Sequence, residues 1–358
     1  TGVGVGAIVG GGILALAGVA FATTGPAAIL AFAINGVIAM LTALSIAEMS
    51  SKFPESGGTY TFARKVLSVE AAFSVGWVVW FASVVAAVLY ALGFAYFALI
   101  LTGDLLSAAN VQRPGWLDHS MVVPALAILA TVLLAIQLSV SRGGGGTWAN
   151  IAKVVVFAVL VLGGFWAVAR QGPRDTSEAR RPFFTNGVSG LVQAMGYTFI
   201  ALQGFDLIAA VGGEVKNPSK TIPRAMILSL AIALIIYLPL LFVIAGVGTS
   251  AGQSITEVAA EDPEGIVAVA ARNYLGTAGY WLVVVAAVLS MFTALQANLF
   301  AASRIALAMS RDRTLPTILQ IRSANLGTPV VAIAATALLV TVLILAIPEV
   351  ASAGAASS

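Results

Sequence analysis

Two charged side chains lie deep inside long apolar runs, where a charge is costly and is by default a candidate functional group. Lys153 lies six residues into a run that begins near Thr147, and Asp206 lies within a run at 188–213. Six residues of helix place the amine about 9 Å deep. Because desolvation disfavours a charged amine, Lys153 is a candidate for binding and releasing a proton. Extension of its side chain toward the nearer surface is the alternative.

Glycines interrupt two of the apolar runs. The first run contains Gly10, Gly11 and Gly12 in VGAIVGGGIL, and each glycine weakens a helix by about 1 kcal/mol relative to alanine. An unwound hinge here would offer free backbone amides to an anion, especially a carboxylate. The alternative is close helix packing, since glycines also recur every fourth residue from position 2 to position 10.

The second interruption lies in FIALQGFD, where Gln203 and Gly204 precede Asp206. Asp206 is predicted to cap a half-helix that restarts after Gly204, which is compatible with a functional role for its carboxylate. With Asp206 and Lys153 at comparable depths, a direct ion pair between them is a further prediction.

Composition sets the class of protein that holds these groups. The 358 residues are 59% hydrophobic and only 9% charged, where a soluble chain carries about 25% charged residues. The sequence therefore predicts an all-α polytopic membrane protein whose outer surface meets the lipid bilayer. No cysteine and the single histidine His119 exclude thiol nucleophiles, disulfides, zinc clusters and haem ligation. No metal or cofactor is expected, and a net charge of +3 without a large basic patch argues against nucleic acid.

Nine stretches are long and apolar enough to cross a bilayer. They are 2–22, 26–49, 70–102, 120–141, 147–169, 188–213, 222–247, 277–309 and 329–347, with a surface segment expected at 255–275. One set of alternate loops carries eleven cations against five acids, and the other carries six against nine. The positive-inside rule places the first set, and with it the N-terminus, in the cytoplasm. The chain begins inside an apolar run without Met, so we expect it to be a fragment.

The two glycine interruptions fall in spans one and six. Backbone can leave the helical ladder at membrane depth only where it faces protein or a water-filled cavity. Paired interruptions at matching positions of two halves indicate an inverted-repeat transporter. We therefore predict one transporter domain over 1–358, with repeats at 1–170 and 185–358 and an end before or at helix ten. A channel would need a polar pore, and an enzyme a convergent catalytic set, and the sequence shows neither.

Four segments give the chain a family resemblance. It resembles the amino acid–polyamine–organocation transporters, particularly bacterial permeases similar to the cationic amino acid transporter branch. The segments are VGAIVGGGIL, FPESGGTYTFARK, GFDLIAAVGGEVKNPSKTIPRA and SRIALAMSRDRTLP. The resemblance implies a five-plus-five inverted repeat with broken helices one and six, in a bacterial or archaeal cell membrane.

The resemblance also implies roles for residues at the two interruptions. Members of the family bind the carboxylate of an amino acid at the first hinge and its ammonium group at carbonyls of helices one and six. The residues that correspond to this site are Ala7, Ile8, Gly10, Gly11, Gly12, Phe199, Ile200, Ala201, Gln203 and Gly204. Gly11 departs from the Ser or Thr common there, and Gln203 adds polarity to the side-chain pocket. Lys153 matches a fifth-helix lysine of the proton-coupled members, and Asp206 joins it as a coupling candidate.

The function expected on these grounds is secondary active transport of amino acids, coupled to protons and working by alternating access. A polyamine or organocation transporter and an amino acid exchanger are the alternatives. An amino acid and a proton are thus the expected partners, together with lipid.

Overall fold

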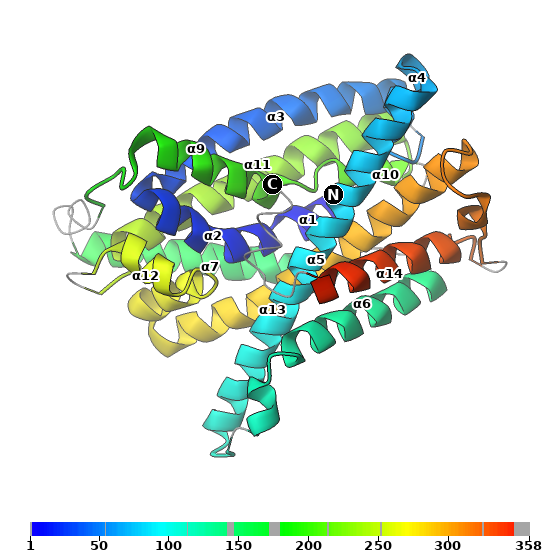
Figure 1. Ribbon diagram of the computed structural model, residues 1–358. Coiled ribbons are helices and arrows are strands. Elements are labelled where there is room, and N and C mark those ends of the chain that lie inside the picture. Colours follow the sequence, from blue (N-terminus) through cyan, green and yellow to red (C-terminus); the bar gives the residue numbers. More distant parts are fainter. Residues whose placement is uncertain are drawn as a thin grey trace.

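The computed structural model describes residues 2–53, 55–112, 114–141, 147–171, 180–212, 215–250, 253–323 and 326–346. Within these ranges every regular element is a helix, as the composition predicted (Figure 1). The α-helices are α1 (Gly2–Ile8), α2 (Gly11–Thr24), α3 (Ala28–Lys52), α4 (Thr59–Val66), α5 (Val69–Ala108), α6 (Val122–Val140), α7 (Thr147–Gln171), α9 (Gly187–Thr198), α10 (Leu207–Ala210), α11 (Pro218–Val247), α12 (Ile255–Glu261), α13 (Ile266–Arg311) and α14 (Val330–Ala346). Short 3-10 turns are η1 (Gly25–Ala27), η2 (Gly115–Asp118), η3 (Phe199–Leu202) and η5 (Thr317–Gln320).

Seven helical stretches in the described ranges are long and apolar enough to cross a membrane. The first of them, Gly4–Lys52, contains two of the predicted spans, because Pro26 in η1 separates α2 from α3. The predicted span at 329–347 forms α14, which is a shorter apolar helix. Together these elements cover all nine predicted spans. The division of the chain into two repeats stays a prediction.

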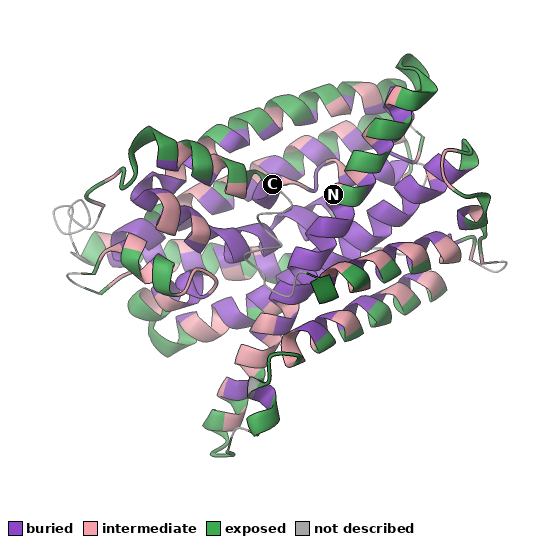
Figure 2. Cartoon of the chain, in the orientation of Figure 1, coloured by how far each residue is buried: buried purple, intermediate pink, exposed green. Residues whose placement is uncertain are grey.

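The outward faces of these helices carry large apolar side chains. Val37 and Leu41 on α3 are both 62% exposed, Leu162 on α7 is 69% exposed and Ile235 on α11 is 72% exposed. The buried residues concentrate in the middle of the bundle, along α1, α2, α5 and α13 (Figure 2). Apolar area outside and small buried residues inside are typical of helices packed in lipid. The chain is an integral membrane protein.

The longest helices cross the centre of the bundle. Helix α5 has 40 residues, which corresponds to about 60 Å and exceeds the roughly 30 Å hydrocarbon core of a bilayer. It runs obliquely past α13 and continues, with η2, beyond the neighbouring helices (Figure 1). Helix α13 has a kink at Gly276, whose φ is 68°.

The segment at 255–275 was expected to be half loop and half surface helix. It forms α12 and the first part of α13, and the side chains of Ile255 and Ala259 are buried. A β-carbon on Gly18 of α2 would lie 1.9 Å from the carbonyl oxygen of Pro263, so this segment contacts α2 backbone to backbone. It packs over α2, and Glu257 and Glu261 on its outer side are exposed.

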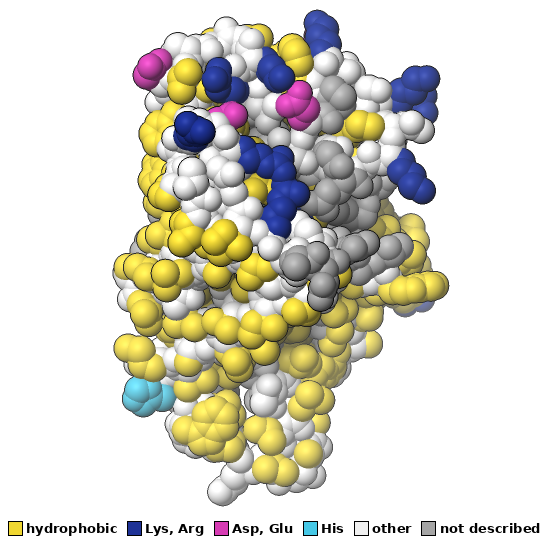
Figure 3. Space-filling view, turned by 90° about the vertical axis from the view of Figure 1, so that its right-hand side faces the viewer, with side chains coloured by type: hydrophobic (Ala, Val, Ile, Leu, Met, Phe, Trp, Pro, Cys, Tyr) yellow, Lys and Arg dark blue, Asp and Glu magenta, His cyan; other side chains and the backbone are white. Residues whose placement is uncertain are grey.

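One end of the bundle is defined by α4 and the end of α13. The hydroxyl of Tyr60 on α4 donates a hydrogen bond to Asp312 at 2.8 Å, and the carboxylate of Asp312 also lies 3.8 Å from Arg64. Figure 3 looks onto this end, where Lys and Arg side chains gather over the upper part of the face. We call it the α4 end.

Candidate functional site

The first apolar span is broken where the glycines predicted it. Helix α1 ends at Ile8, α2 begins at Gly11, and Gly10 between them has a φ of 105°. Such a φ is strained for residues that carry a β-carbon, which explains glycine at this position. The first amides of α2, those of Gly11 and Gly12, have no possible partner within their own helix. The prediction of an unwound hinge is confirmed, with the break one residue before Gly11.

The sixth apolar span is broken as well. Helix α9 ends at Thr198, η3 follows, and Gln203 is extended. Gly204 has a φ of 123°, and the short helix α10 begins at Leu207. The Asp206 carboxylate accepts a hydrogen bond from the Gly204 amide at 3.1 Å, within the break itself. Asp206 precedes the first residue of α10, as predicted, but no side-chain cap hydrogen bond from it to α10 is formed.

The two breaks lie directly against each other, although almost 200 residues separate them in the sequence. A β-carbon on Gly12 would lie 2.4 Å from the Cα of Ala201. A β-carbon on Gly204 would lie 2.9 Å from the β-carbon of Ala7. The contact between the two breaks therefore requires glycine at both Gly12 and Gly204, since a larger residue at either position would push the two backbones apart.

A tyrosine that the sequence did not single out completes the first break. The hydroxyl of Tyr237 on α11 accepts the Gly10 N–H at 3.1 Å and donates to the carbonyl oxygen of Ile8. Tyr237 is fully buried. One hydroxyl thus satisfies two backbone groups that the break removes from the helical ladder.

Lys153 is buried, with no exposed side-chain surface, so extension of its amine toward the membrane surface is excluded. Its amine donates to the carbonyl oxygens of Gly6 and Val9, both at 3.2 Å, and to the hydroxyl of Thr293 at 2.8 Å. These acceptors match the three donors of an ammonium group. The predicted ion pair with Asp206 is not among these contacts. The amine lies instead at the carbonyl end of α1, which carries the negative end of the helix dipole.

Helix α13 brings a second hydroxyl to the break. A β-carbon on Gly10 would lie 2.2 Å from the hydroxyl oxygen of Ser290, and that oxygen is buried without a hydrogen-bond partner. The hydroxyl of Thr293, three residues further on, has two carbonyl oxygens available for its one proton, that of Ser290 at 3.1 Å and that of Gly6 at 3.4 Å. Neither Ser290 nor Thr293 was singled out from the sequence.

Helices α5 and α3 also contribute side chains beside the breaks. A β-carbon on Gly11 would lie 2.8 Å from the ring of Tyr90, which is 2% exposed and within electrostatic range of the Asp206 carboxylate. Asn35 on α3 donates to the Met195 carbonyl at 2.8 Å and to Thr198 at 3.0 Å, where α9 ends. Both breaks are thus supported by polar side chains from other helices.

The residues expected to bind substrate are brought together with one exception. Ala7, Ile8, Ile200 and Ala201 are buried beside the three hinge glycines and Gly204, and Gln203 is half-buried. Phe199 is 38% exposed, so its side chain points away from the breaks and only its backbone lies near them.

The apolar helices, the two broken spans and the buried amine together define a class of protein. It is an integral membrane protein in which two interrupted spans cross at their breaks, beside a buried amine. The chain belongs to the amino acid permease family, whose model matches residues 3–356. This confirms the resemblance seen in the sequence motifs, and the family is one of transporters.

Individual relatives agree with this assignment. A methylthioribose transporter and the branched-chain amino acid permease BcaP, both of Bacillus subtilis (strain 168), are each 30% identical over 87% of this chain and 66% of their own length. Cationic amino acid transporter 2, vacuolar, of Arabidopsis thaliana is 31% identical over 94% of this chain and 52% of its own length. The chain thus spans about two thirds or less of the length of these relatives.

Proposed function

We propose that the protein is a secondary active transporter of amino acids that works by alternating access and is coupled to protons. The observation that carries this proposal is the crossing of the two breaks. It places the free amides of Gly11 and Gly12 next to the backbone of Ala201, between the carbonyl end of α1 and η3.

Such a crossing offers opposite charges to the two ends of an amino acid. The amides that begin α2 are partly positive and attract a carboxylate, and the carbonyl ends of α1 and η3 attract an ammonium group. Tyr90 and Ser290 line the same place and supply hydroxyl groups. The relatives named as branched-chain and cationic amino acid transporters support the same substrate class.

Proton coupling is assigned to Lys153. Its three acceptors belong to α1, to Val9 directly after α1 and to α13, and they stabilise the charged amine while α1 stays in place. A movement of α1 that removes Gly6 and Val9 leaves the amine buried with fewer acceptors, which favours its neutral form. Asp206 lies on the other broken span and would respond to the same movement. A proton affinity that differs between the two states is what coupling requires.

The test is uptake into proteoliposomes under an inward proton gradient. We expect Lys153→Ala to lose most gradient-driven accumulation and to keep substrate binding in detergent. Gly11→Leu should lose binding, because its side chain would enter the space beside the Tyr90 ring. Lys52→Ala is the matched control, since Lys52 pairs with Glu48 on the exposed surface of α3 and should transport normally.

Three outcomes would contradict the proposal or part of it. Wild-type accumulation by Lys153→Ala would leave that amine with a structural role only. A requirement for sodium, or for an exchangeable amino acid inside the vesicles, would replace proton coupling by another mechanism. Uptake of polyamines in place of amino acids would change the substrate class while keeping the same site.

A further inference from the structure

A polar cavity lies apart from the breaks, at the end of the bundle opposite the α4 end. It is an open cavity with a volume of about 450 Å³, lined by α5, η2, the start of α6 and α13. Its polar lining consists of Tyr96, Asp104, His119, Ser120 and Tyr280. Along α5, fourteen residues separate Asp104 from Tyr90, which corresponds to about 21 Å. A ligand of amino acid size cannot span that distance, so this cavity and the breaks are separate sites.

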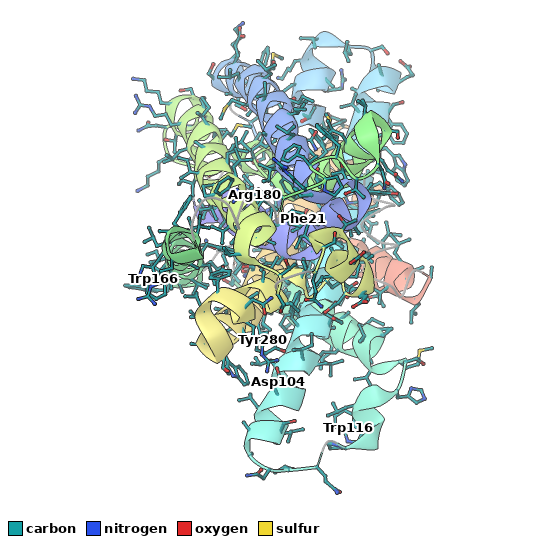
Figure 4. All side chains as sticks on the ribbon, turned by 90° about the vertical axis from the view of Figure 1, so that its left-hand side faces the viewer. Phe21, Asp104, Trp116, Trp166, Arg180 and Tyr280 are labelled. Carbon is teal, nitrogen blue, oxygen red and sulfur yellow. The ribbon has the colours of Figure 1, made fainter. Side chains whose placement is uncertain are left out.

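Its central feature is a carboxylate held by a tyrosine. The hydroxyl of Tyr280 on α13 donates to Oδ2 of Asp104 on α5 at 2.8 Å. Figure 4 labels both residues where the two helices meet. A carboxylate accepts several hydrogen bonds, so the bond from Tyr280 orients Asp104 and leaves acceptor positions for a ligand. The carboxylate is half-buried, which strengthens its attraction for a cation relative to a fully exposed one.

The surroundings of the cavity also favour a cation. Tyr96 lies within electrostatic range of Asp262 and Glu264, in the loop between α12 and α13, so further negative charge borders the cavity. The guanidinium of Arg272 already lies 5.9 Å from the centroid of the Tyr280 ring. That arginine is exposed, so its guanidinium can be displaced into water at little cost. His119 accepts the Met121 N–H through Nδ1 at 3.3 Å.

We propose that this cavity binds an organic ammonium ion, with the Asp104 carboxylate as its counter-ion and the Tyr96 and Tyr280 rings as aromatic walls. A cation placed over a tyrosine ring is stabilised by the ring quadrupole, and more so when it is partly desolvated. The cavity volume falls within the range of small-molecule sites. An adjoining groove, which shares Leu99 and Leu117 with the cavity, is mainly apolar and would accommodate the alkyl part of such a ligand.

The inference goes beyond the proposed transport function and does not depend on it. An ammonium ion bound here would raise the local concentration of amines at one end of the bundle, whatever passes through the breaks. Conversely, transport at the breaks needs no ligand at Asp104. The two proposals can therefore fail separately.

The test is a binding titration of the purified protein with 1,4-diaminobutane, using 1,4-butanediol as the uncharged probe of the same length. We expect the diamine to bind and the diol not to bind. Asp104→Asn keeps a partner for the Tyr280 hydroxyl and removes the charge, so we expect it to weaken diamine binding at least tenfold. Arg272→Gln removes the competing guanidinium and should strengthen binding severalfold, a gain that a misfolded protein would not show.

Asp312→Asn serves as the matched control, because Asp312 is likewise bonded to a tyrosine, Tyr60, at the α4 end. Arg64, Lys65 and Arg311 border that second tyrosine–aspartate pair, so it should not hold a diamine and the substitution should leave binding unchanged. Gly11→Leu should also leave it unchanged, which separates this cavity from the breaks. Wild-type affinity in Asp104→Asn, or equal binding of the diol, would overturn the proposal.

Discussion

Removal of the Tyr237 hydroxyl is the most direct test of how the first break is held open. In Tyr237→Phe the ring stays in place and one oxygen is lost. That oxygen serves both the N–H of Gly10 and the carbonyl of Ile8, and neither group can return to the helical ladder while Gly10 keeps its φ of 105°. The substitution therefore leaves two buried backbone groups without this partner.

The size of the effect follows from the cost of such groups. Each buried unsatisfied donor or acceptor costs about 1–3 kcal/mol, so the pair sets a range of about 2–6 kcal/mol. Partial repair by the nearby Ser290 hydroxyl, which has no partner of its own, favours the lower end. A loss of about 2 kcal/mol lowers the melting temperature of a chain of this length by about 3 °C.

The assay is thermal unfolding of the purified protein in detergent. Tyr197→Phe is the matched control, because the hydroxyl of Tyr197 accepts only an exposed hydrogen bond from Gln193. We expect the control to melt within about 1 °C of the wild type, as exposed substitutions usually do. If Tyr237→Phe also melts within that margin, the tyrosine hydroxyl does not hold the break open, and the cost assigned to the two backbone groups is wrong.

Two further predictions concern the second break and the orientation of the chain. Gly204→Ala should destabilise the protein by about 2 kcal/mol or more in the same melting assay, because its φ is 123° and its new β-carbon would lie 2.9 Å from that of Ala7. Gly196→Ala on α9 is the control. Its β-carbon meets nothing within 4 Å, so it should be neutral or stabilising. Cysteine placed at Ser254 should react with an impermeant thiol reagent added to intact cells, and cysteine at Ser219 should not. The opposite labelling order would place the N-terminus outside the cell, and the absence of native cysteine keeps the result free of background.

The positions of glycines and of charged residues allowed the sequence to predict the two breaks and the buried amine. Both interruptions were located to within a residue or two, because a glycine triplet and a glycine between Gln203 and Asp206 interrupt otherwise apolar runs. The structure gives Gly10 and Gly204 a positive φ. The buried amine was found for the same kind of reason, since Lys153 lies six residues inside the apolar run that begins near Thr147. Its partners were not found. Asp206 was the nearest charge by depth, but depth along a helix does not fix the face to which a side chain points.

The residues that were missed share one property. Tyr237, Tyr90, Ser290 and Asn35 are ordinary members of their own helices, and each becomes significant only through a contact with a distant segment. Tyr237 meets Gly10 across 227 positions of sequence. A tyrosine in an apolar helix is more often a packing residue, so no local pattern distinguishes this one. Its unusual feature is a hydroxyl that faces backbone rather than water, and only the fold shows that.

The two contacts that hold the first break differ in how they respond to movement. Tyr237 lies on α11, which packs along α3 and also against α7 and α1, and its hydroxyl bonds the backbone on both sides of the break. Lys153 lies on α7, and its third acceptor, Thr293, lies on α13. A displacement of α1 with α11 and α3 would therefore keep the Tyr237 bonds and lose the Gly6 and Val9 carbonyls from the amine. The break would survive the transition as a rigid feature, while the proton affinity of Lys153 would change. Under the proposed mechanism, Tyr237 would keep the break intact in both states and Lys153 would change its protonation between them. We therefore expect Tyr237→Phe to lose stability and Lys153→Ala to lose coupling.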